Sequence, residues 1–216
     1  MTAFFQPIKL SLIVSLIALI IVIVLGMAIA WLMAKKNFRG KVWIETFLLL
    51  PIVLPPTVIG FLLIMLFGQN GFFGKVSQLF FGQSLIFSIW AAVIAAVIVA
   101  FPLMYQSVKT GISFVDQHVE DAARVDGANE WKVFSFITLP LIKKSLVSGV
   151  VLSFARALGE FGATLMFAGN IPGRTQTVPM AIYVAFESNK MALAWGWVLS
   201  IIVISFVMLL FLRNSA

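Results

Sequence analysis

Two residues of opposite charge stand four positions apart inside a long apolar stretch of the sequence. They are Arg156 and Glu160, and positions i and i+4 share one face of a helix. A charge within a bilayer costs at least about 2.5 kcal/mol on insertion scales, so the pair must face the interior of a helical bundle. Two interpretations stay open. The pair neutralises itself as a structural ion pair, or Arg156 attracts a passing oxyanion while Glu160 weakens the field so that the anion does not stick.

The residue patterns of a catalytic or nucleotide-binding centre are missing from the sequence. His118 is the only histidine, there is no cysteine, and neither a His-Glu-x-x-His pattern nor a second imidazole is available to share a metal. A phosphate-binding loop needs Gly, four residues and Gly-Lys-Ser/Thr; Gly74-Lys75-Val76 comes nearest and fails at the hydroxyl position. We therefore predict a non-catalytic chain without a metal or cofactor of its own.

The chain that positions these residues has the composition of a membrane protein. Of its 216 residues, 62% are hydrophobic and 11% charged, whereas soluble domains carry about 25% charged residues. A helix needs roughly 20 residues to cross the hydrocarbon layer. We predict an all-α integral membrane protein with a single transmembrane domain over residues 1–216. Its spans are expected at about 8–34, 46–67, 85–108, 145–168 and 192–212, joined by a polar loop over 109–144.

A further apolar run, Val178–Phe186, is too short to cross a bilayer. We interpret it as a re-entrant or interfacial helix behind the turn at Pro172-Gly173, and a sixth span stays possible. Cytoplasmic loops are enriched in Lys and Arg, and with five spans most basic residues fall on one side of the membrane. That side carries Lys35, Lys36, Arg39, Lys41, Lys109, Arg124, Lys132, Lys143, Lys144 and Arg213. The predicted N-terminus is therefore outside and the C-terminus cytoplasmic, and topology rather than nucleic-acid binding explains the net charge of +7.

Three prolines interrupt the second predicted span. Pro51, Pro55 and Pro56 each lack a backbone donor and clash with the preceding turn, so this helix should be kinked or broken. Either the bend lines a transport pathway, with freed carbonyls facing a polar cavity, or it is a packing kink.

The polar loop over 109–144 carries the pattern of a short helix. Val119, Ala122, Ala123 and Asp126 recur at helical spacing, which gives a small-residue face that a partner backbone can approach closely. Gly127 is suited to end this helix, and Pro140 to mark the entry into the next span.

The same loop resembles the cytoplasmic loop of bacterial binding-protein-dependent ABC importers. Their motif reads Glu-Ala-Ala, three residues, Gly, nine residues, Ile, one residue, Leu-Pro. It is matched at every position but one by Asp121, Ala122, Ala123, Gly127, Ile137, Leu139 and Pro140. The departure is Asp121 in place of the glutamate, with Glu120 just before it. The resemblance implies a type I ABC importer permease fold in which these residues and Glu120 form a coupling helix that seats in a groove of a separate ATPase subunit.

Three other stretches are similar to permeases for oxyanions. Residues 154–164 resemble the sulfate and molybdate permease group, and residues 50–58 and 170–179 resemble molybdate permeases more than sulfate ones. The implied protein is the permease of a molybdate or tungstate importer in a prokaryotic plasma membrane. The implied partners are a second copy of the chain, two ATP-binding cassette subunits that bind ATP and Mg, an extracytoplasmic oxyanion-binding protein and the lipid bilayer.

The candidate pathway residues combine the proline break with the charged pair: Pro55, Pro56, Thr57, Arg156, Glu160 and Thr164. Sulfate or another oxyanion is the alternative substrate. An ion-coupled secondary transporter is a more remote alternative, because Glu160 is the only carboxylate inside a predicted span and five spans do not divide into matched halves.

Overall fold

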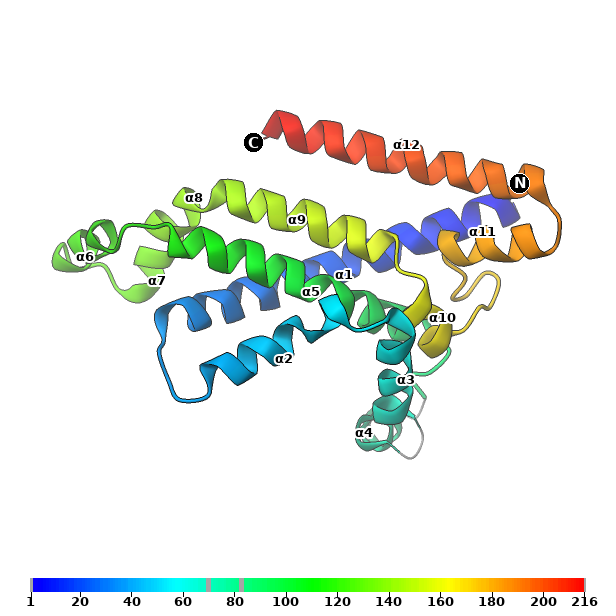
Figure 1. Cartoon of the computed structure of the whole chain (residues 1–216), viewed down its shortest axis with the longest axis horizontal. Coiled ribbons are helices and arrows are strands. Elements are labelled where there is room, and N and C mark those ends of the chain that lie inside the picture. Colours follow the sequence, from blue (N-terminus) through cyan, green and yellow to red (C-terminus); the bar gives the residue numbers. More distant parts are fainter. Residues whose placement is uncertain (1, 69–70, 82–83, 216) are drawn as a thin grey trace.

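The computed structural model describes residues 2–68, 71–81 and 84–215, and every regular element in these ranges is a helix. Within them, three helices are long and apolar enough to cross a membrane: α1 (Thr2–Lys35), α5 (Ile89–Ser113) and α12 (Met191–Ser215). A fourth long helix, α9 (Lys143–Leu158), runs beside α5 along the longest axis of the molecule (Figure 1). The prediction of an all-helical membrane fold is confirmed.

The second predicted span is broken, as its prolines indicate. It consists of α2 (Lys41–Val53) and α3 (Pro56–Phe67), which meet at an angle of 117°. The last bond of α2 runs from the Leu54 amide to the Leu50 carbonyl, and Pro55 follows in an extended conformation without a donor to continue the ladder.

The prediction of one continuous helix over 145–168 is wrong. The segment divides into α9 and α10 (Gly162–Ala168), and residues 159–161 between them are not helical. The Glu160 side chain accepts a hydrogen bond from the Ala163 amide at 2.7 Å, which satisfies a free donor at the start of α10. Glu160 therefore lies in the break and not on the helical face that carries Arg156.

Other boundaries differ by a few residues from those expected. α5 begins after Ser88, whose hydroxyl accepts from the Ala91 amide, and it continues to Ser113, beyond the predicted start of the loop at 109. A helix that was not expected, α4 (Phe72–Phe81), follows α3, and the short apolar run forms α11 (Val178–Glu187).

The polar loop is folded into short elements that gather at one end of the bundle (Figure 1). They are α6 (Gln117–Val125), α7 (Glu130–Val133), the π-helix η1 (Phe134–Thr138) and α8 (Leu139–Leu141). The chain then turns by 76° into α9. We call this the α6 end of the bundle, and the opposite end, which holds α10 and α11, the α11 end.

Small residues allow the central helices to pack closely. Five of the thirteen buried residues of α5 are alanines, and a Cβ added to Gly26 of α1 would stand 2.6 Å from Met104 Cγ. On α9, a Cβ at Gly149 would lie 3.0 Å from Ser107 Cβ. Contacts of this kind are typical of membrane helices, whose association depends on close backbone approach.

The longest helix, α1, connects the two ends of the bundle. At the α11 end, the Ser11 hydroxyl accepts from the Val178 amide at 2.8 Å, and the Phe4 carbonyl accepts from Trp197 Nε1 at 2.9 Å. Its last residue, Lys35, lies at the α6 end beside Glu120.

Candidate functional site

The helix α6 is capped at both ends by its own neighbouring residues. At its start, the Asp116 carboxylate accepts from the His118 amide at 2.9 Å. At its end, Gly127 adopts a φ of 88°. The amide of Gly127 bonds the Arg124 carbonyl, and the amide of Ala128 bonds the Ala123 carbonyl. This pair of bonds is the Schellman termination, which favours glycine because of the left-handed conformation. Gly127 therefore ends the helix as predicted.

Glu120 is fully buried and joins three parts of the chain. One oxygen, Oε2, pairs with Lys35 Nζ of α1 and lies 3.6 Å from Arg124 Nη2, while Oε1 accepts from the Thr138 hydroxyl of η1 at 2.7 Å. A buried carboxylate needs such partners, because an unpaired one carries a large desolvation cost. Glu120 therefore faces the bundle and not the surface where the family resemblance implies that a partner binds.

The opposite side of α6 is exposed and largely free of charge. Val119 is 45% and Val125 88% exposed, and Ala122 and Asp126 are also exposed. Three of the four residues of the predicted small-residue face thus point away from the bundle, and Ala123 is half-buried. Small residues on this exposed side leave room for the backbone of a partner to approach α6 closely.

Beside this face, Arg124 organises two exposed carboxylates. Its Nη1 bonds Asp121 Oδ1 at 2.6 Å, and its Nε bonds Glu130 Oε1 of α7 at 2.7 Å. The hydrogen bond from Arg124 lowers the pKa of Glu130 below its ordinary value, and the same bond raises the pKa of Arg124. Asp121, which replaces the motif's glutamate, is 52% exposed in its side chain and therefore available to a partner.

The second half of the motif forms the connection from α6 to α9. The Leu139 amide bonds the Phe134 carbonyl five residues back, which defines the π-helix and places the Thr138 hydroxyl toward Glu120. π-Helices of this length often mark functional positions. Leu139 packs against the core of the bundle, Ile137 is half-buried and Pro140 is exposed. Ile137, Leu139 and Pro140 therefore position the helix α9 rather than the surface of α6.

At the other end of α9, the two broken spans meet. A Cβ added to Gly162 of α10 would stand 2.9 Å from Pro56 Cβ, and one added to Gly60 of α3 would stand 2.6 Å from Met166 Cβ. Figure 1 shows α3 and α10 side by side. The proline break and the charged segment are therefore neighbours in space, as a shared site requires.

The charged pair lies at this junction. Arg156 Nη1 is 2.5 Å from Glu160 Oε2, and Glu160 is 3% exposed while the Arg156 side chain is 31% exposed. The guanidinium thus keeps an open side that an anion could approach. Pro55, Pro56 and Thr57 are exposed, but Thr164 is only 2% exposed and lies inside the bundle. The structure brings Arg156, Glu160 and the proline break together, and it does not place Thr164 on the same open surface.

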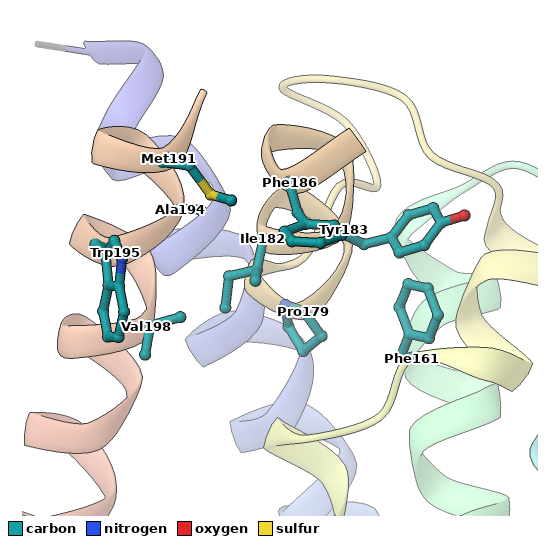
Figure 2. A pocket seen from close by; sticks show the side chains of 9 residues that line it. All are labelled: Phe161, Pro179, Ile182, Tyr183, Phe186, Met191, Ala194, Trp195 and Val198. Atoms are coloured by element: carbon teal, nitrogen blue, oxygen red, sulfur yellow. The ribbon is translucent and has the colours of Figure 1, made fainter. Parts of the chain in front are cut away.

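The residue next to Glu160 links the break to α11. The ring of Phe161 faces that of Tyr183, with centroids 5.4 Å apart (Figure 2). Both rings line an apolar pocket of about 610 Å³ between α11 and α12. Its walls offer hydrocarbon and aromatic surface, which suits a lipid chain or an apolar helix and not a hydrated anion.

No group of three or more His, Cys, Asp and Glu side chains that could hold a metal ion is found in the part of the chain that the structure describes. His118 is exposed at the start of α6.

Comparison with known families gives a match over most of the chain. Residues 22–216 match the family described as binding-protein-dependent transport system inner membrane component. YvgM of Bacillus subtilis strain 168, which is named for a molybdenum transport system, is 57% identical over 213 residues, or 98% of this chain and 93% of that protein.

Two further relatives are named for the transport of different substances. The molybdenum transport system permease protein ModB of Haemophilus influenzae is 47% identical over 178 residues, which is 82% of this chain and 78% of that protein. The sulfate transport system permease protein CysW of Synechococcus elongatus is 34% identical over 190 residues, which is 88% of this chain and 66% of that protein.

Solved structures show the same fold at low identity. A chain of a bacterial ABC transporter that imports the acidic polysaccharide alginate matches with a TM-score of 0.80 at 15% identity, over 100% of this chain and 79% of that chain. A second structure, of the alginate transporter in complex with its periplasmic protein, matches with a TM-score of 0.78 at 16% identity, over 99% and 78% of the two chains. The expected permease fold of type I ABC importers is confirmed.

Proposed function

The chain belongs to the family of binding-protein-dependent transport system inner membrane components, and we propose that it is the membrane-spanning permease subunit of an ATP-driven importer for molybdate or tungstate. The observation that carries the proposal is the segment 116–140. It combines the complete spacing of the loop motif with an exposed small-residue face on α6 and a buried carboxylate that holds this helix to α1 and η1.

The substrate class follows from the relatives. The two relatives described above that are named for molybdenum are 57% and 47% identical to this chain, and the sulfate permease described beside them is 34% identical. Molybdate and tungstate are nearly equal in size and charge, so both are proposed as cargo. Sulfate is the second candidate, because the sulfate permease still aligns over 88% of this chain.

The proposed partners follow from the two ends of the bundle. An ATP-binding cassette subunit, which binds ATP and Mg, would seat the exposed face of α6. An external oxyanion-binding protein would dock at the α11 end. Two copies of this chain and two ATPase subunits would form the complete importer, and this chain would hold no cofactor and catalyse no reaction. In this assembly the α6 end and the C-terminus are cytoplasmic and the N-terminus lies outside, in a prokaryotic plasma membrane.

The contacts of Glu120 provide a route from the ATPase to the spans. A displacement of α6 would act through the Glu120 carboxylate on Lys35 at the end of α1, and on Thr138 at the turn into α9. The break at 159–161 lies at the far end of α9, so motion of this helix would change the position of Arg156 relative to α3 and α10. Opening of the pathway to alternate sides would follow from these rigid shifts.

The first test is ATP hydrolysis in proteoliposomes that contain this chain, its ATPase subunit and its binding protein. We expect molybdate and tungstate to stimulate hydrolysis and sulfate to leave it at the basal rate. Stimulation by sulfate alone would keep the permease function and overturn the substrate. If no oxyanion stimulated hydrolysis in a demonstrably assembled complex, the proposed oxyanion transport would be wrong.

A further inference from the structure

A second polar site lies between α5 and α9, in their halves near the α6 end. The cleft has a volume of about 370 Å³ and is lined by six polar residues, which are Gln106, Ser107 and Thr110 of α5 and Lys144, Ser145 and Ser148 of α9. The helices approach closely here, since a Cβ on Gly111 would stand 2.6 Å from Ser145 Cβ. Ser107 and Ser145 are half-buried at the floor, and the other four residues are exposed at the rim.

The position of this cleft is unusual for a surface of a single membrane chain. Gln106 lies in the span candidate α5, and Ser148 lies in α9, which passes as part of a span together with residues 130–141; both side chains are exposed. By contrast, the exposed face of α12 carries Leu199, Val203 and Phe206, as expected of a helix that meets lipid. Polar side chains within a bilayer face a bundle interior or a water-filled path rather than hydrocarbon.

The chemistry of the cleft favours an anion. Lys144 is its only charged residue, and the others offer hydroxyl and amide donors. In the described residues, the Ser148 hydroxyl donates to the Lys144 carbonyl at 3.0 Å, and the other five side chains make no hydrogen bond or ion pair. Several free donors around one cation, in an open cleft without arginine, suit weak and reversible binding of a tetrahedral oxyanion.

We propose that this cleft is a second, low-affinity oxyanion site of the transport pathway, on the α6 side of Arg156. Lys144, Ser148, Leu152 and Arg156 recur at intervals of four residues, so each is the neighbour of the next in a row that winds around α9. Leu152, which is 49% exposed, stands between the two cations and separates their sites by an apolar step. This inference rests on the proposed oxyanion transport and adds the position at which the anion pauses before release.

The cysteine-free sequence allows a direct test by thiol labelling. Ser148→Cys is placed in the assembled transporter, in vesicles whose α6 side faces the medium, and labelling of this chain is followed by mass spectrometry. An anionic methanethiosulfonate (the ethylsulfonate) is compared with a cationic one (the ethyltrimethylammonium), each relative to its rate with a free thiol. We expect the anionic reagent to react about threefold faster or more, because of the nearby Lys144 charge.

Two neighbouring lysines provide matched variants. Lys144→Gln should remove the preference for the anionic reagent, whereas Lys143→Gln, one residue outside the cleft, should leave it unchanged. Excess molybdate should slow labelling of Ser148→Cys but not of Leu199→Cys on α12. Equal rates for the two reagents, a preference that survives Lys144→Gln, or labelling as slow as at Leu199→Cys would each overturn the site.

These outcomes are separable from failure of the proposed function. If oxyanions stimulate ATP hydrolysis in the wild type but labelling shows no charge preference, the importer stands and this second site is wrong. If the wild type responds to no oxyanion, the proposed function fails whatever the labelling shows.

Discussion

Two glutamates are buried in the part of the chain that the structure describes, and they are held by different kinds of contact. Glu120 is held by Lys35 and Thr138, which are 85 and 18 residues away in the sequence, as well as by Arg124. Glu160 is held by Arg156 and the Ala163 amide, both within four residues. Each glutamate therefore neutralises a cation, but only Glu120 joins elements that are distant along the chain.

Glu120 therefore connects separate elements, whereas Glu160 holds only the break between α9 and α10. Removal of the Glu120 carboxylate would loosen α6 from both α1 and η1 at once. Removal of the Glu160 carboxylate would affect the break between α9 and α10 and leave the contacts between distant elements in place. The α6 end is thus connected to distant parts of the chain, whereas the contacts of the break stay within it.

The largest effect is expected from a substitution at Gly127, which leaves both glutamates in place. Proline cannot adopt its φ of 88° and lacks the amide that bonds Arg124, so Gly127→Pro should disrupt the end of α6 at a cost of about 3 kcal/mol or more. We expect the chain to insert normally and oxyanion-stimulated ATP hydrolysis to fall at least about tenfold, which is 1.4 kcal/mol of coupling.

Gly40 supplies the control for this variant. It has a φ of 90°, and, as at Gly127, no atom lies within 4 Å of an added Cβ. Gly40→Pro should therefore introduce comparable strain without loss of stimulation. Normal uptake by Gly127→Pro would contradict the coupling role of α6.

The next largest effect is expected from Glu120→Gln. The amide has the shape of the carboxylate but leaves Lys35 and Arg124 without their buried counter-charge, and breaking a buried pair costs about 3–5 kcal/mol when the partners are fully buried. Here both cations are 30% exposed in their side chains, so we expect about 2 kcal/mol, measured as a lower midpoint of thermal unfolding in detergent.

Thr138→Val separates the contribution of the hydrogen bond from that of the charges, because it removes one hydrogen bond to Glu120 and keeps the charges. Its cost should be about 1–3 kcal/mol, as for a buried acceptor left without a donor. Asp121→Asn, on the exposed side of α6, should leave the unfolding midpoint unchanged. If the unfolding midpoint of Glu120→Gln equalled that of Asp121→Asn, Glu120 would not hold α6 to α1 and η1.

Arg156→Gln tests the other glutamate and decides between the two interpretations of the charged pair. If Arg156 guides the anion, uptake should fall about tenfold while most of the protein still assembles. The double variant Arg156→Gln with Glu160→Gln removes both charges. If the pair is only structural, the double variant should recover uptake as well as assembly; if Arg156 guides the anion, the double variant should assemble and its uptake should stay low.

The smallest effect concerns pH at the contact between α6 and α7. Because the hydrogen bond from Arg124 lowers the pKa of Glu130 in the folded protein, this pair stabilises the fold above the ordinary pKa of a glutamate and loses its effect as the pH falls through the lowered value. Glu130→Gln should therefore lower the free energy of unfolding at pH 7 by less than about 1 kcal/mol, because the pair is exposed. The unfolding midpoint should fall slightly. The difference should vanish in acid, and high salt should reduce it; a difference that grows in acid would contradict the assigned cause.

The sequence predicted best what is decided locally. Apolar runs located the spans, the prolines located the break between α2 and α3, and Gly127 located the end of α6. Each of these signals acts on its own neighbours in the chain. The stretches similar to molybdate permeases agree with the names of two relatives, which are proteins of molybdenum transport systems.

What the sequence did not reveal depends on contacts between distant segments. The break at 159–161 has no proline, and it depends on the Glu160 bond to Ala163 and on the close packing of Gly162 against Pro56. The burial of Glu120 depends on Lys35 and Thr138, which no local pattern connects to it. The coupling role of α6 and the pathway residues stay predictions.

The helix α1, with 34 residues, is long enough to reach from one end of the bundle to the other. At 1.5 Å per residue the helix is about 50 Å long. Lys35 at one end pairs with Glu120. Toward the other end, Ser11 and Phe4 accept hydrogen bonds from Val178 and Trp197. A tilt of about 3° about one end would carry the other by roughly 2.5 Å, which is enough to break and remake a hydrogen bond. A rigid tilt of α1 would therefore change the contacts at one end of the bundle without any change in the length or shape of a helix.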